Sequence, residues 1–127
     1  MTGPSSQKPK SPFASEFDAS RQMTTFLNEL DMGIRAANQE IVHERIPDLS
    51  REKAFVFATM VARLRADYLD AAFKHCSPGA PLDSAAIEDL RAKRLTYEEA
   101  REAFQALRHA IEVGYIDIEQ MNKSGRG

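Results

Sequence analysis

The chain has 127 residues, of which 43% are hydrophobic and 28% charged, and its 17 basic and 19 acidic residues give a formal net charge of -2. This length corresponds to one ordinary domain, and the apolar content is enough to fill a core, which excludes a disordered chain. The near-neutral charge excludes a polyelectrolyte that coats nucleic acid or an anionic membrane. The lone cysteine excludes a disulfide framework and a zinc site built on several cysteines.

Both ends of the chain have the composition of mobile tails. Residues 1–14 are rich in Pro and Ser, and residues 123–127 are polar, so neither end buries enough apolar surface to offset its chain entropy. We therefore expect a single helical domain over residues 15–122. No segment has the apolar run of a signal peptide or the roughly 20 apolar residues of a spanning helix, which predicts no membrane insertion and a cytoplasmic location.

The spacing of apolar residues predicts a first long helix that starts near Ser15 or Asp18 and is stopped by Pro47. Steps of four and three separate these residues, which is the heptad spacing that keeps one stripe facing a partner helix. The stripe consists of Met23, Leu27, Leu30, Ile34, Ala37 and Ile41.

The same spacing predicts a second helix, with Asp48 or Ser50 as its N-cap and with Ser77-Pro78-Gly79 after its end. Its stripe consists of Ala54, Phe57, Val61, Leu64, Tyr68, Ala71 and His75. Because the loop over residues 45–49 is short, we expect the first two helices to form an antiparallel hairpin.

A short third helix is predicted from the N-cap Asp83 to about Leu95, followed by a last long helix that begins at a capping box of Thr96 and Glu99. The stripe of the last helix consists of Tyr97, Ala100, Phe104, Leu107, Ile111, Gly114, Ile118 and Met121. Gly114 is either a helix C-cap with a separate turn from Asp117, or a small residue inside one continuous helix. The unbroken spacing favours the continuous helix.

No segment alternates apolar and polar residues with a period of two, so the predicted fold is all-α, an antiparallel bundle of three long helices and one short helix. The three long stripes contain no Asp, Glu, Lys, Arg, Asn or Gln, and their only polar members are Tyr68, Tyr97 and His75 at the end of its helix. The interhelical seam is therefore predicted to be dry, and no catalytic centre, metal or cofactor is expected within it.

Candidate chemical groups lie at helix ends and on outer faces. Glu40 and His43 have the Glu-x-x-His spacing of two metal ligands, but His43 falls on the outward side and no second such motif exists, so a solvated helix end is favoured. The end of the second helix favours a charged His75 but gives no help to a Cys76 thiolate, so Cys76 is interpreted as a packing residue. His109 lies on the outer face of the last helix, as a phosphotransfer histidine does. It is not followed by the Lys-Gly that phosphotransfer domains place just after that histidine, so this role is not favoured.

Basic residues between positions 91 and 108 are interleaved with acidic ones and have few aromatic neighbours. Pairs four residues apart, such as Asp89 and Lys93, predict a salt-bridged helix surface, and nucleic-acid binding is not expected.

The second helix also carries apolar residues outside its stripe. Such a helix is either the central element of its domain or one wall of an interface. Either the third and fourth helices cover these residues, or they pair with another copy or a partner protein. The predicted interface residues are Phe55, Ala62, Leu69 and Phe73 with Val113 and Ile116 of the last helix.

The dry seam, the surplus apolar surface and the lack of a catalytic constellation lead to one main hypothesis. The protein is a non-enzymatic interaction or regulatory module that acts through exposed helix faces, with a protein partner or as a homodimer. One alternative is a ligand- or metal-binding sensor or enzyme with its site at a bundle end, around Glu40, His43 and Glu44 or around His75 and Cys76. A secretion or assembly chaperone is another, and it differs from the main hypothesis only in its partner.

Overall fold

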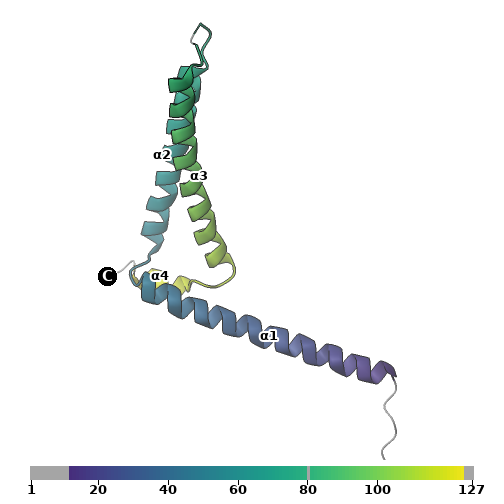
Figure 1. Ribbon diagram of the computed structural model, residues 1–127. Coiled ribbons are helices and arrows are strands. Elements are labelled where there is room, and N and C mark those ends of the chain that lie inside the picture. Colours follow the sequence, from purple (N-terminus) through teal and green to yellow (C-terminus); the bar gives the residue numbers. More distant parts are fainter. Residues whose placement is uncertain (1–11, 80, 125–127) are drawn as a thin grey trace, which may run out of the picture. The chain divides into compact units, whose positions relative to one another are not determined.

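The computed structural model describes residues 12–79 and 81–124, and all the regular structure within these ranges is helical. The elements are α1 (Pro12–Arg45), α2 (Arg51–His75), α3 (Ser84–Glu112) and α4 (Ile118–Ser124) (Figure 1). The predicted all-α fold of three long helices and one short helix is confirmed. The short helix is the last of the four, however, and not the third. None of the described helices is both long enough and apolar enough to cross a membrane.

The chain divides into two compact units, Met1–Ala37 and Asn38–Gly127. The described part of the first unit is α1 up to Ala37, and the second unit contains the last turns of α1 with α2, α3 and α4. α1 begins at Pro12, earlier than predicted, and proline is well suited to a first helical position. Residues 1–11 and 125–127 lie outside the described ranges, so the predicted tails and the single domain over residues 15–122 stay predictions.

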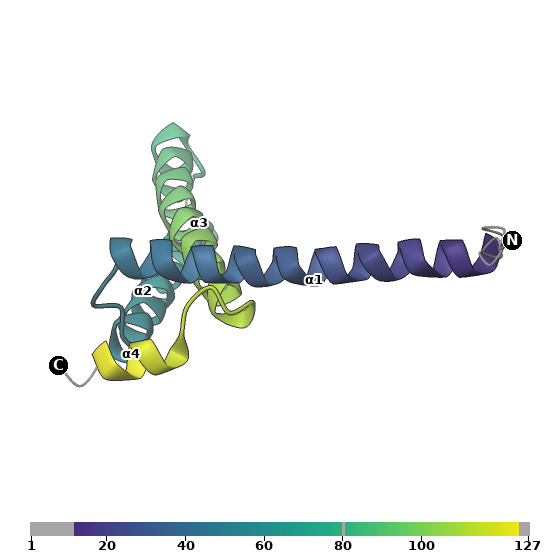
Figure 2. The ribbon, with the colours of Figure 1, turned by 90° about the horizontal axis from the view of Figure 1, so that it is seen from below.

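α2 and α3 lie side by side and form an antiparallel pair (Figures 1 and 2). The predicted stripe of α2 forms its half of the seam, with Val61 and Ala71 buried and the other members half-buried. The rings of Phe57 and Phe104 meet edge to face, with their centroids 5.4 Å apart. The expected hairpin of the first two helices is thus replaced by one of α2 and α3, because α3 presents a continuous apolar stripe with aromatic residues that match those of α2.

Two predicted N-caps begin these helices. The Ser50 hydroxyl accepts a hydrogen bond from the Lys53 backbone N–H at 3.2 Å, and Asp83 Oδ1 accepts one from the Ala86 N–H at 2.9 Å. Each bond satisfies a backbone donor that has no partner within the helix. The loop between α2 and α3 contains Gly79 with a φ of 85°, a conformation that favours glycine.

The predicted boundary at Thr96 is wrong, because α3 continues through it. The Thr96 hydroxyl donates to the Ala92 carbonyl at 3.0 Å, as a residue inside a helix does. Ser84–Glu112 contains neither glycine nor proline, so nothing in this range breaks the helix. The capping-box spacing of Thr96 and Glu99 occurs here without a helix start.

The predicted continuity through Gly114 is also wrong, because α3 ends there in a Schellman motif. Gly114 has a φ of 80°. The Tyr115 N–H donates to the Ala110 carbonyl at 2.8 Å, and the Gly114 N–H donates to the Ile111 carbonyl at 3.2 Å. These two bonds satisfy carbonyls that the helix end would otherwise leave unpaired. The alternative of a glycine cap with a new start at Asp117 is the one the structure contains.

α4 is held within the second unit by its first turn and by its apolar side. Asp117 Oδ1 accepts a hydrogen bond from the Glu119 N–H at 2.9 Å, which caps the helix. Ile116 and Met121 are buried. The Gln39 side chain donates to the Gly114 carbonyl at 2.7 Å and so ties the last turns of α1 to the end of α3.

Candidate interaction surfaces

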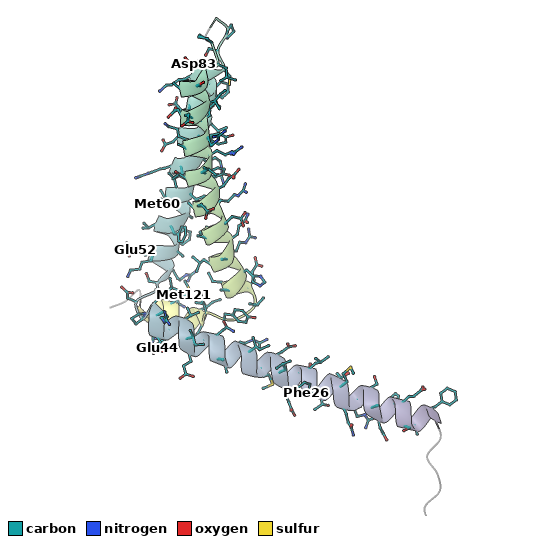
Figure 3. All side chains as sticks on the ribbon, viewed as in Figure 1. Phe26, Glu44, Glu52, Met60, Asp83 and Met121 are labelled. Carbon is teal, nitrogen blue, oxygen red and sulfur yellow. The ribbon has the colours of Figure 1, made fainter. Side chains whose placement is uncertain are left out.

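The first four members of the predicted stripe of the first helix, Met23, Leu27, Leu30 and Ile34, are called the α1 stripe, and all four are exposed. These side chains are between 39% and 65% accessible, and Phe26 beside them is 60% accessible. Phe26 is labelled on α1 in Figure 3. Most helical stability in proteins comes from packing of an apolar face, so a regular stripe left open to water is a candidate binding surface.

Gly33 lies beside this stripe inside α1, although glycine weakens a helix. Its φ is not positive, and a Cβ atom at this position would meet no other atom of the described residues within 4 Å, apart from its chain neighbours and the backbone of its own helix turns. Neither backbone conformation nor packing within the chain therefore explains the glycine. A close approach by another chain would explain it.

The second exposed surface is the outer α2 face, which carries Phe55, Ala62, Leu69 and Phe73. Phe55, Leu69 and Phe73 are 50% to 79% accessible. Near the start of the helix, Phe55, Val56, Thr59 and Met60 line a shallow hollow of about 320 Å³ between Glu52 and Arg63. Met60 lies on the side of α2 away from α3 (Figure 3).

The six predicted interface residues therefore fall into two groups. Phe55, Ala62, Leu69 and Phe73 are exposed together on α2. Val113 is half-buried at the end of α3, and Ile116 is buried in the turn that leads to α4. Val113 and Ile116 are therefore less accessible than the four α2 residues, and a shared interface of all six stays a prediction.

Comparison of the chain with family models, with curated proteins and with solved structures finds no match. The exposed apolar surfaces therefore remain the main physical indication of a function.

At the end of α1, the second unit contains a cavity of about 30 Å³ lined by Gln39, Val42, His43, Tyr115 and Met121 among others. This volume holds about one water molecule, whereas ligand pockets typically have about 300–1,000 Å³. Glu40 and Glu44 are exposed. Among the described residues, no three His, Cys, Asp or Glu side chains are grouped to hold a metal ion.

His75 takes part in an ion-pair cluster that joins the ends of α2 and α3. Its Nε2 lies 2.8 Å from Asp89 Oδ2, and Lys93 Nζ donates to Asp89 Oδ1 at 2.6 Å. The hydrogen bonds from Lys93 and then from His75 lower the pKa of the Asp89 carboxyl. The predicted pairing of Asp89 with Lys93 is confirmed. The interpretation of Cys76 as a packing residue is wrong, because its side chain is exposed.

A cluster of aromatic and basic residues along the middle of the hairpin escaped the sequence analysis. Tyr68 stacks on Tyr97 with their centroids 6.2 Å apart, and Arg65 Nε donates to the Tyr97 hydroxyl at 3.1 Å. Arg101 lies over the Tyr97 ring. The hydrogen bond from Arg65 lowers the pKa of Tyr97. The spacings of Arg65 to Tyr68 and of Tyr97 to Arg101 were available signals, since such neighbours share a helix face.

The remaining basic residues of α3 behave as the sequence suggests. Arg108 pairs with Glu112 at 3.0 Å and Arg94 lies 3.9 Å from Glu98, each four residues apart. His109 is exposed on the outer side of α3. These pairs give α3 a surface of mixed charge, and we still do not expect it to bind nucleic acid.

Proposed function

We propose that this protein is a non-enzymatic interaction module that works by pairing exposed helix faces with another protein chain. The observation that carries the proposal is the α1 stripe, whose heptad spacing is that of helix-on-helix packing and whose members are exposed. A regulatory or adaptor protein needs such a surface, because binding a partner is its whole activity. The outer α2 face supplies a second apolar surface.

The stripe has enough apolar surface to bind a helix reversibly. Burying a Leu, Ile or Met side chain completely contributes about 1.5–3 kcal/mol, so a side chain that is half-exposed gains roughly 1 kcal/mol when a partner covers it. Several such side chains on each of two helices offset an association cost of about 4–15 kcal/mol by a narrow margin. This balance suits a partner that binds and leaves.

The alternative of a ligand or metal site at a bundle end has less support. The cavity beside His43 is far smaller than an organic ligand, and the described residues offer no metal-ligand cluster. The chaperone alternative uses the same helix faces and would differ in the partner that a capture experiment identifies.

Site-specific photo-crosslinking in the native host tests the proposal. A photoreactive amino acid at Leu27 lies in the stripe, and the same group at Met32 lies on the opposite side of α1, where the side chain is also exposed. We expect covalent adducts from position 27 and few from position 32. Equal yields at the two positions, or no adduct at either, would refute a function based on this stripe.

A further inference from the structure

We propose that the chain that covers the α1 stripe is a second copy of this protein, packed antiparallel along α1. This inference rests on the proposed function and names its partner. In the proposed pair, Leu27 lies against the partner's Leu30, and Met23 lies against the partner's Ile34. The four contacts lie entirely within the first unit.

The stripe has the symmetry that such a pair needs. A two-fold interface brings the same patch of both copies together, so the patch must be complementary to itself. The spacing of four, three and four residues from Met23 to Ile34 is the same in both directions along the helix. A two-fold axis between Leu27 and Leu30 therefore places an apolar side chain opposite each of the four.

In this register, the residues along one edge of the α1 stripe are also complementary to the same edge of the second copy. Phe26 and Gly33 precede Leu27 and Ile34 and lie on the same edge. In an antiparallel pair with Leu27 opposite the partner's Leu30, that edge faces its own copy and Phe26 comes to lie over the partner's Gly33. The large exposed ring of Phe26 thus meets Gly33, the only glycine of α1, which has no side chain. This contact explains why a glycine stands inside the helix.

A parallel pair lacks this fit. Parallel helices with this heptad spacing bring Phe26, the residue just before Leu27, against the residue five places further along the partner. Phe26 would then press against the partner's Asp31 and remove water from a carboxylate, which is unfavourable. The dipoles of antiparallel helices also attract each other, whereas those of parallel helices repel.

The area is sufficient for a weak dimer. The exposed parts of the four stripe residues and Phe26 amount to roughly 500 Å² per chain, or about 1,000 Å² for the pair, which is near the lower limit of specific interfaces. We therefore expect reversible dimerisation, with the dimer fraction rising with protein concentration.

Sedimentation velocity of the full chain over a range of concentrations tests the pairing. Leu27→Asp should raise the dimer dissociation constant by about tenfold or more, since it buries a charge in the seam, while Met32→Asp on the opposite side serves as the matched control and should leave it unchanged. Gly33→Leu should also weaken the dimer, although leucine favours the helix more than glycine does. Adding Phe26→Ala to Gly33→Leu should restore pairing.

These variants separate pairing from folding. A wild-type chain that sediments as a monomer at all concentrations overturns the proposal, as does a Gly33→Leu chain that dimerises as well as the wild type. Helix content measured by circular dichroism shows whether a Leu27→Asp chain has lost α1 itself, and the Gly33→Leu result decides the question in that case.

Cysteine cross-linking tests the direction of the helices. In a Cys76→Ser background, Met23→Cys and Ile34→Cys chains are mixed and oxidised with copper phenanthroline. An antiparallel pair should give mainly the mixed disulfide, because position 23 lies against the partner's position 34. Predominant disulfides between identical positions would indicate a parallel pair and overturn the proposal.

The two proposals fail separately. If the purified chain is a monomer while the Leu27 photo-crosslink captures a different protein, self-pairing is wrong and the interaction function stands. If position 27 gives no adduct above position 32 and the chain is a monomer, both are wrong.

Discussion

Replacing Gly114 by alanine gives the sharpest test of how α3 ends. Gly114 has a φ of 80°, and an L-residue with a side chain pays about 1–2 kcal/mol in this left-handed region. Alanine also lowers the entropy of the unfolded chain, which returns about 0.4–1 kcal/mol. The net expectation is a loss of about 1 kcal/mol in the free energy of unfolding, or about 4–8 °C in Tm for a domain of this size.

The variant chain has one way to avoid this strain, which is to continue α3 as a helix through position 114. That route would withdraw Ile116 and Met121 from their buried positions. Exposing two such side chains costs about 3–6 kcal/mol, several times the strain at one residue. The variant should therefore keep the turn and lose stability, with an unchanged helix content.

Thermal and urea unfolding followed by circular dichroism at 222 nm measure both quantities. Gly114→Asn should lose less stability than Gly114→Ala, because asparagine tolerates the left-handed region. Gly79→Ala, which has the same sign of φ in an open loop, is the control for strain without a helix end. A Gly114→Ala chain that is as stable as the wild type and more helical would refute the reasoning and would favour the continuous helix.

Two further predictions concern the α2–α3 hairpin. The hydrogen bonds from Lys93 and His75 lower the pKa of Asp89 below 3.8 in the folded chain, so its stabilising effect is complete above that pH and is lost as the pH falls further. Urea unfolding at several pH values measures the difference in stability between the wild type and Asp89→Asn. This difference should shrink below pH 3.8, and a difference that stays constant would contradict this account. Phe57 and Phe104 should show a coupling of about 0.5–1.5 kcal/mol in a double-mutant cycle with leucine, whereas additive losses would mean that their edge-to-face contact contributes nothing.

The parts of the fold that follow from local chemistry could be predicted from the sequence. Ser50 and Asp83 cap helices because each side chain accepts a bond from a backbone donor three residues later. The α2 stripe from Ala54 to His75 lies in a seam because helical spacing fixes which residues share a face. These features depend on a few neighbouring residues, so a single sequence is enough to identify them.

The failures have a common cause, which is that one local pattern can serve two structures. Ile118 and Met121 continue the spacing of α3, yet they belong to a new helix that returns to the second unit. The Schellman bonds are local, but the burial of Met121 beside Gln39 and Val42 depends on residues distant in sequence. The same holds for the capping-box spacing at Thr96, which begins a helix only where the preceding chain is not already helical.

The choice of helix partners follows the same logic. It explains why the predicted interface residues include the outer α2 face but none of the α1 stripe. The stripes of α1 and of the last long segment have equivalent spacing, so periodicity alone does not tell which of them covers α2. Aromatic pairs such as Phe57 with Phe104 and Tyr68 with Tyr97 favour α3, because side-chain shape decides between apolar faces of equal length. Under the proposed function, the exposed α1 stripe is the surface that meets another chain. If the proposal holds, the same apolar spacing that predicts a core stripe serves as a binding face.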